Sequence, residues 1–126
     1  MSQLPHPFAD VPRPLGRLLR PASIAVVGAS ADVRAFGGFV LGNLLRFGYP
    51  PAQLHLVSRS SDDIDGLRCV KTVAELPPGI DLAVLAIPES GVLDAVAGLA
   101  ARGCHAAVLF DADSLDTITV TAAPLT

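Results

Sequence analysis

Four short runs of apolar residues constrain the fold of this chain more than any other feature. They cover residues 24–27, 54–57, 82–87 and 106–110. Most of the runs are continuous rather than alternating, which is typical of strands buried on both faces of a parallel sheet. Helical patterns separate the runs, and such alternation gives parallel strands joined by right-handed crossovers. We therefore predict a single α/β domain with a doubly wound, Rossmann-like and mostly parallel sheet.

Three helices are expected between these strands. One face of the first helix carries four apolar residues, namely Phe36, Val40, Leu44 and Phe47. Gly48 then ends that helix. Thr72 and Glu75 form a capping box for a short second helix. The last helix buries Val92, Val96 and Leu99 and stops before Gly103.

The length of 126 residues fits one domain with two flanking segments. We predict a Pro-rich flexible arm at residues 1–14, the domain at 15–110 and a tail without a recognisable pattern at 111–126. Residues 15–20 are expected to form one helical turn that Pro21 ends.

Composition argues against several classes of protein. The chain is 51% hydrophobic, yet no apolar run reaches the ~20 residues of a membrane span. Nine basic and twelve acidic residues give a net charge of −3, whereas nucleic-acid binders usually present a basic face. Cys69 and Cys104 match no metal-binding spacing and fit a reduced, cytoplasmic setting. We therefore expect no membrane, nucleic-acid or metal partner.

Ligands of such sheets bind beyond the carboxyl ends of the strands, so the loops there form the candidate site. The loop after the first strand begins Gly28-Ala29-Ser30 and leads to a helix that contains Gly37. Gly28 permits a sharp exit from the strand, and the small residues after it let an anion approach the backbone. Gly37 lets the helix N-terminus come close to that anion. The loop predicts a phosphate site, although its spacing is not G-x-G-x-x-G, and a turn required only for packing is the alternative.

The loop after the second strand reads Ser58-Arg59-Ser60. An NAD site usually has an acid there, which binds the ribose 2′-hydroxyl. An arginine between two hydroxyls instead suits a phosphate group on the adenosine ribose. NADP and coenzyme A both carry such a phosphate, so these residues leave both cofactors open. A solvated arginine without a ligand is the remaining alternative.

Five segments, taken in order, resemble one known family. They are 21–30 (PASIAVVGAS), 43–49 (NLLRFGY), 64–66 (IDG), 75–77 (ELP) and 80–88 (IDLAVLAIP). Their order and spacing resemble the N-terminal CoA-binding domain of NDP-forming acyl-CoA synthetases, which are relatives of the succinyl-CoA synthetase α subunit. The resemblance covers residues 15–110. It implies that the chain is the CoA-binding part of an acid–thiol ligase, with CoA or acyl-CoA as its ligand.

The resemblance also implies residue roles. In this family the first loop meets the pyrophosphate region of CoA, a role that falls on Gly28, Ala29, Ser30 and Gly37. The loop after the second strand contacts the adenosine end and often reads Val-Asn-Pro-Lys. Here the lysine position holds Ser60, so Arg59 supplies the charge instead. Ile87 and Pro88 match the loop that lies along the cofactor.

The resemblance stops after Phe110. Family members continue with a Gly-Phe-x-Glu segment and with later domains that carry a phosphorylated histidine, and residues 111–126 match neither. We therefore expect that this chain alone has no ligase activity and that His6, His55 and His105 have no catalytic role. We also expect an open sheet edge or an uncovered apolar face at Phe110, where remaining domains or a partner subunit would dock.

Two alternative functions stay open from the sequence. One is an NADP-binding domain of the oxidoreductase type. The other is a truncated fold that binds no ligand and acts through contacts with another chain.

Overall fold

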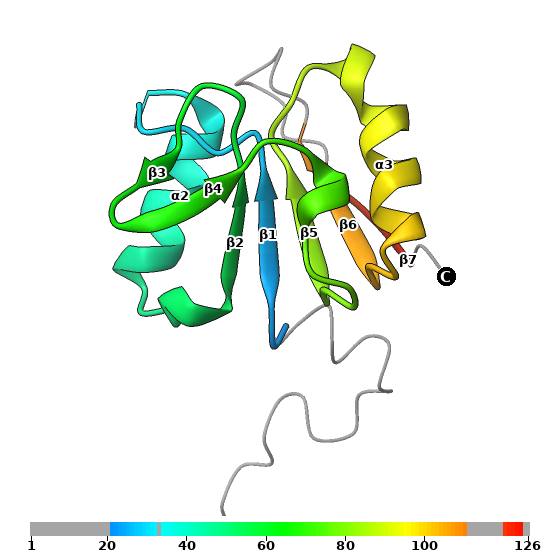
Figure 1. The fold of residues 1–126 in the computed structure, drawn as a ribbon, viewed down its shortest axis with the longest axis horizontal. Coiled ribbons are helices and arrows are strands. Elements are labelled where there is room, and N and C mark those ends of the chain that lie inside the picture. The colour runs from blue at the N-terminus through cyan, green and yellow to red at the C-terminus, as the bar shows by residue number, and fades with distance from the viewer. Residues whose placement is uncertain (1–20, 33, 111–119, 125–126) are drawn as a thin grey trace, which may run out of the picture.

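A seven-stranded sheet forms the centre of the computed structural model, which describes residues 21–32, 34–110 and 120–124. The strand order is β3-β4-β2-β1-β5-β6-β7 (Figure 1). The strands are β1 (Ile24–Val27), β2 (Leu54–Val57), β3 (Asp63–Ile64), β4 (Leu67–Val70), β5 (Leu82–Leu85), β6 (Ala106–Phe110) and β7 (Val120–Pro124). The α-helices are α2 (Phe36–Arg46) and α3 (Val92–Ala101), and the short 3₁₀ helices are η1 (Pro51–Gln53), η2 (Val73–Glu75) and η3 (Glu89–Gly91).

The central strands are parallel and buried, as their continuous apolar sequences predict. β1 lies between β2 and β5 and pairs with both in parallel register, so that Ile24 aligns with Leu54 on one side and Leu82 on the other. β6 continues the sheet in parallel beyond β5. All four residues of β1 and of β5 are buried. The predicted doubly wound, mostly parallel fold is therefore confirmed.

Helices cover both faces of the sheet. Figure 1 shows α2 and α3 on opposite sides of it. Successive residues of a strand point to opposite faces, so the strands contribute to two separate apolar layers. Leu41 of α2 packs into one layer with Val26 and Leu56. Leu99 of α3 packs into the other with Val27 and Leu85.

The edges of the sheet differ from the sequence-based prediction. β4 pairs in parallel with β2, and β3 forms a short antiparallel ladder with β4. β7 pairs antiparallel with β6 along its whole length, from Phe110 opposite Val120 to Ala106 opposite Pro124. The expectation of an open sheet edge beside Phe110 is therefore wrong, because residues 120–124 occupy that edge. The predicted arm at residues 1–14 and the turn at 15–20 lie outside the described residues.

The short helix after β4 is a single 3₁₀ turn. The Glu75 carboxylate accepts hydrogen bonds from the backbone N–H groups of Lys71, at 2.7 Å, and Thr72, at 3.2 Å. This is the carboxylate half of the predicted capping box, and it fixes the start of η2. At the end of α3, the Arg102 guanidinium donates two hydrogen bonds to the Leu76 carbonyl oxygen, so α3 is joined to the segment after η2.

The face that α2 turns to the sheet is offset from the predicted one. Leu41 is 1% exposed, whereas Phe47 is 83% exposed and Phe39 58%. The cause lies in Gly37 and Gly38, which are buried. A Cβ on Gly37 would collide with the Gly28 carbonyl group, so the helix approaches the sheet most closely along its glycine side. Val40 and Leu44 pack only at the margin of the core.

His55 on β2 makes the stability of the fold depend on pH. Burial lowers the pKa of His55 from its ordinary value of 6.5. Below pH 6.5 the His55 imidazole binds a proton more readily in the unfolded chain than in the folded chain. Acidification therefore favours unfolding. We predict that the free energy of unfolding decreases as the pH falls from 7.5 to 5. Urea titrations should show a shallower decrease for His55→Gln, and identical slopes for the two proteins would contradict this role.

Candidate ligand site at the carboxyl edge of the sheet

Three loops meet where the parallel strands end. The first loop (residues 28–35) follows β1, the second loop (58–62) follows β2 and the third loop (86–91) follows β5. Because β1 lies between β2 and β5, the three loops are neighbours at one edge of the sheet (Figure 1). The chain order reverses direction across β1 and β5, and open α/β sheets bind ligands at such a switch point.

Backbone hydrogen bonds tie the three loops together. The N–H groups of Gly28 and Ala29 both donate to the Val57 carbonyl oxygen, each at 3.0 Å. On the other side of β1, the Ala86 N–H donates to the Val27 carbonyl oxygen at 2.8 Å. The amides of Gly28 and Ala29 therefore already have partners, and these two residues shape the site rather than donate to an anion.

Gly28 is required by its backbone angle and by its neighbours. Its φ is +93°, and a Cβ there would collide with the Ala86 carbonyl group and approach Ile87 Cγ2 at 2.9 Å. Gly37 in turn packs against the Gly28 carbonyl group. The first loop, the third loop and the start of α2 are thus in direct contact through two glycines.

The N-terminus of α2 has features of an anion site. Its N-cap residue, Ala35, forms no side-chain capping hydrogen bond, and the first turn holds no acidic residue. The first N–H groups of a helix lack intrahelical partners and favour a negative charge. A phosphate placed there would meet the positive end of the helix dipole, with no acidic side chain in the first turn to repel it.

Asp32 and Arg34 organise the exposed part of the first loop. The Asp32 carboxylate accepts hydrogen bonds from the Arg34 backbone N–H, at 2.9 Å, and from Arg34 Nε, at 3.1 Å. These bonds hold the pKa of the Asp32 carboxyl below its ordinary value. The Ser30 hydroxyl accepts a hydrogen bond from the Asp32 N–H at 3.1 Å, so Ser30 stabilises the same turn.

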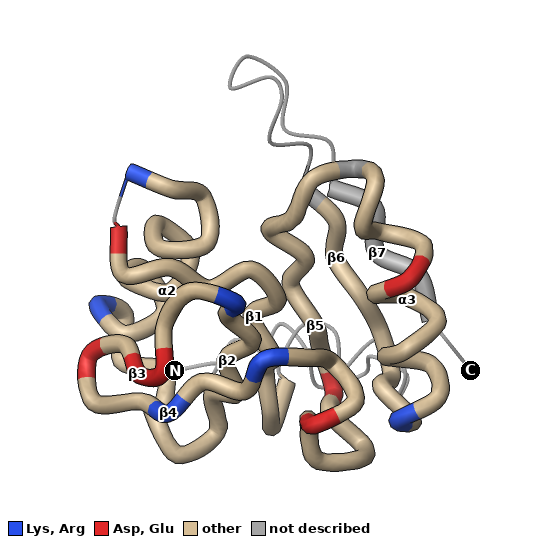
Figure 2. The backbone as a smooth tube through the Cα atoms, turned by 45° about the horizontal axis from the view of Figure 1, so that its top comes forward, with Lys and Arg blue, Asp and Glu red and all other residues tan. Residues whose placement is uncertain are grey.

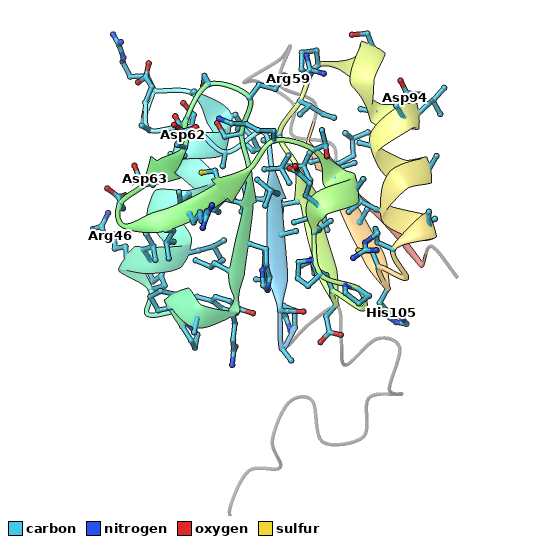
Figure 3. The ribbon with its side chains drawn as sticks, in the orientation of Figure 1. Arg46, Arg59, Asp62, Asp63, Asp94 and His105 are labelled. Atoms are coloured by element: carbon cyan, nitrogen blue, oxygen red, sulfur yellow. The ribbon has the colours of Figure 1, made fainter. Side chains whose placement is uncertain are left out.

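The second loop divides into a buried and an exposed part. Ser58 is 3% exposed, and its hydroxyl accepts a hydrogen bond from the Ser61 N–H at 3.2 Å. Arg59 and Ser60 are exposed. Within the described part of the chain Arg59 has no ion pair. Figure 3 shows Arg59 at the end of the sheet where the three loops meet, while His105 lies at the opposite end.

Lys71 is a component of the site that the sequence analysis missed. Its Nζ donates to the Ser61 carbonyl oxygen at 3.0 Å and pairs with the Asp62 carboxylate at 2.9 Å. The pKa of Asp62 is lowered as a result. Lys71 directly follows β4, and Val70 pairs with Val57 in register. Recognition of β4 as a parallel neighbour of β2 would have placed Lys71 beside the second loop.

The structure brings all nine predicted site residues to one edge of the sheet. Six are in the loops after β1 and β5 or at the start of α2: Gly28, Ala29, Ser30, Gly37, Ile87 and Pro88, of which Pro88 is exposed. Ser58, Arg59 and Ser60 complete the set. Figure 2 shows a group of acidic segments beside β3 and further acidic segments near β5 and on α3. Within the described residues, no group of three or more His, Cys, Asp or Glu side chains is placed to hold a metal ion.

The family of the chain follows from a direct match. The model of the CoA binding domain family matches residues 22–123, which is most of the chain and includes the three loops. The chain therefore belongs to the CoA binding domain family. As its sequence predicted, it resembles the N-terminal part of NDP-forming acyl-CoA synthetases.

Similar proteins support this assignment. The chain is 46% identical over 98 residues to a trans-feruloyl-CoA synthase from an unknown prokaryotic organism, a match that covers 78% of the chain and 14% of that protein. It is 29% identical over 98 residues to the alpha subunit of the ADP-forming acetate–CoA ligase II of Pyrococcus furiosus, covering 78% of the chain and 21% of the subunit. The chain thus spans about one seventh to one fifth of the length of these relatives.

Solved structures with the same fold include both large and small proteins. The dinucleotide-forming acetyl-coenzyme A synthetase 1 of Ca. Korarchaeum cryptofilum superimposes with a TM-score of 0.72 at 34% identity, covering 78% of the chain and 21% of the synthetase. A conserved hypothetical protein of Pyrococcus furiosus gives a TM-score of 0.63 at 30% identity, and the match covers 69% of the chain and 72% of that protein. None of the helices among the described residues is long and apolar enough to cross a membrane.

Substitution of Gly28 tests how tightly the loops are joined. We predict that Gly28→Ala lowers the free energy of unfolding by ~2–4 kcal/mol, because the new Cβ adds overpacking to a strained positive φ. Gly66→Ala is the matched control, since Gly66 has a φ of +81° with nothing within 4 Å of a Cβ. The control should cost only the backbone strain, ~1–2 kcal/mol. Equal losses in urea denaturation would show that Gly28 does not bring the loops into close contact.

Proposed function

We propose that this chain binds coenzyme A at the carboxyl edge of its sheet. The observation that supports this most directly is the joining of the three loops around an uncapped helix N-terminus, within a chain that belongs to the CoA binding domain family. The diphosphate of CoA would meet the first turn of α2, where the helix dipole favours anions and no acidic side chain lies. Gly28, Ala29 and Gly37 allow the close approach, and Ser30 holds the turn in which the phosphates lie.

The adenosine end of the cofactor is proposed to lie at the second loop. CoA carries a phosphate on its adenosine ribose, and Arg59 is an exposed guanidinium without an ion-pair partner among the described residues. Ser60 adds a hydroxyl beside it. Ser58, being buried, supports the loop from below. Ile87 and Pro88 of the third loop would line the path of the cofactor from the other side.

The choice of ligand is tested by titration calorimetry on the whole chain. We expect CoA to bind more tightly than dephospho-CoA, and both to bind more tightly than NAD. Tighter binding of NADP than of CoA would instead favour an oxidoreductase-type domain. No heat with any of these ligands would favour a fold that acts only through protein contacts.

Arg59 is the residue whose proposed role is most specific. Arg59→Ala should weaken CoA binding by about 1.5 kcal/mol, roughly tenfold, the low end for a hydrogen bond to a charged group because the side chain is exposed. Dephospho-CoA affinity should stay unchanged. Arg68→Ala is the control, since Arg68 is also exposed but lies in β4. Equal losses for CoA and dephospho-CoA would remove Arg59 from the phosphate site.

The biological context proposed for the chain is an acyl-CoA synthetase. Its relatives are much longer, so other domains or a partner subunit would supply the nucleotide and acyl sites. We propose a cytoplasmic, reducing environment, because Cys69 and Cys104 are both buried free thiols. Burial also raises the pKa of each thiol, which keeps both protonated and unreactive.

The chain alone is expected to form no phosphohistidine. His55 lies half-buried within β2, and His105 precedes β6 at the edge opposite Arg59 (Figure 3). Neither is near the loops proposed to hold the cofactor, and His6 lies outside the described residues. Incubation with radiolabelled ATP, acetate and CoA should leave the protein unlabelled and give no acetyl-CoA. A stable phosphoryl group on any of the three histidines would overturn the proposal of a binding module.

A further inference from the structure

An apolar groove runs along α2, from Phe36 at the start of the helix to the segment that follows its end. It has a volume of about 570 Å³ and is lined chiefly by Phe36, Phe39, Val40, Leu44, Phe47 and Tyr49. The rings of Phe36 and Phe39 lie 6.5 Å apart. Phe39 and Phe47 are two of the large apolar side chains that the described residues leave exposed, at 58% and 83%. Exposed aromatic side chains that line one groove indicate a docking surface.

Tyr49, at one end of the groove, forms a hydrogen bond with Pro21, the first described residue. The Tyr49 hydroxyl donates a hydrogen bond to the Pro21 carbonyl oxygen at 3.0 Å. Burial, with a smaller contribution from Asp81, raises the pKa of Tyr49 and keeps this donor protonated. The Ala22 N–H donates to the Asp81 carboxylate at 2.8 Å. Pro21, the first described residue, is therefore held beside the groove by hydrogen bonds at Pro21 and at Ala22.

The sequence before Pro21 is suited to an apolar groove. Leu15, Leu18 and Leu19 have the i, i+3, i+4 spacing of one helix face, while Arg17 and Arg20 fall outside that face. Pro21 forbids continuation of a helix into β1. A helical segment of six residues is about 9 Å long and α2 about 16 Å. The segment 15–20 is thus short enough to lie within the length of α2.

We propose that residues 15–20 form a helical turn that docks in this groove and covers Phe39 and Phe47 with Leu15, Leu18 and Leu19. The attachment at Pro21 favours this occupant over a second copy of the chain. A short tether gives an effective concentration in the millimolar range, well above that of free protein in a typical sample. Docking buries the apolar side of α2 that the sheet leaves uncovered, and Arg17 and Arg20 remain in solvent.

A paramagnetic label on Arg17→Cys tests the proposal in the full chain. Cys69 and Cys104 are buried, so the label attaches to the introduced thiol. We expect the NMR amide signals of Phe39 and Phe47 to lose more than half of their intensity. Leu93, an exposed residue of α3 on the opposite face, should keep its signal. Broadening that is equal on α2 and α3, or absent from both, would overturn the proposal.

Two further samples complete the experiment. Replacing Leu15, Leu18 and Leu19 by serine should restore the signal of Phe39, whereas Phe47, close to the attachment at Pro21, stays partly broadened. The matched control replaces three other apolar residues of the arm, Leu4, Phe8 and Val11, by serine and should keep the broadening. A mixture of spin-labelled protein without ¹⁵N and ¹⁵N protein without the label detects contact between molecules. Broadening in that mixture would show that a second copy fills the groove and would also overturn the proposal.

Discussion

The carbonyl group of Val57 is the junction on which the ligand site depends. It accepts hydrogen bonds from the backbone N–H groups of both Gly28 and Ala29. To present both amides to one oxygen, the chain must turn sharply as it leaves β1, and the φ of +93° at Gly28 provides that turn. As a result, the carbonyl group of Gly28 points at Gly37 and packs against it. The approach of α2, and with it the face that α2 buries, follows from this one arrangement.

Much of the fold could be predicted because its strongest signals are local. The continuous apolar runs identify β1, β2, β5 and β6, and glycines and prolines mark the ends of the helices. β4 has the sequence Leu-Arg-Cys-Val, too short and too mixed to be recognised as a strand of a parallel sheet. β7 depends on pairing with β6, and its own sequence has no periodic pattern that predicts a strand. Tertiary pairing overrides local preference in both cases.

The candidate site was predictable in its residue types but not in its contacts. Small residues after β1 and an arginine after β2 indicate a phosphate ligand. The direction in which each group points is set by the fold: the Ser58 hydroxyl turns inward to Ser61, whereas Arg59 next to it is exposed. Lys71 comes from a different strand and reaches the second loop only because β4 lies beside β2. The apolar pattern on α2 predicted the wrong buried face for a similar reason. The close contact of Gly37, rather than the apolar side chain of Phe47, determines which face of the helix packs on the sheet.

Because β7 runs antiparallel to β6, the first residue of β1 and the last residue of β7 lie at the same end of the strands. Ile24 aligns with Leu82, Leu82 with Ala106, and Ala106 with Pro124. Three strand spacings separate Ile24 from Pro124, a gap of about 14 Å. Both positions lie at the edge opposite the three loops. A domain built in this way can be inserted into a longer chain, or circularly permuted through a short linker, without disturbing its loops.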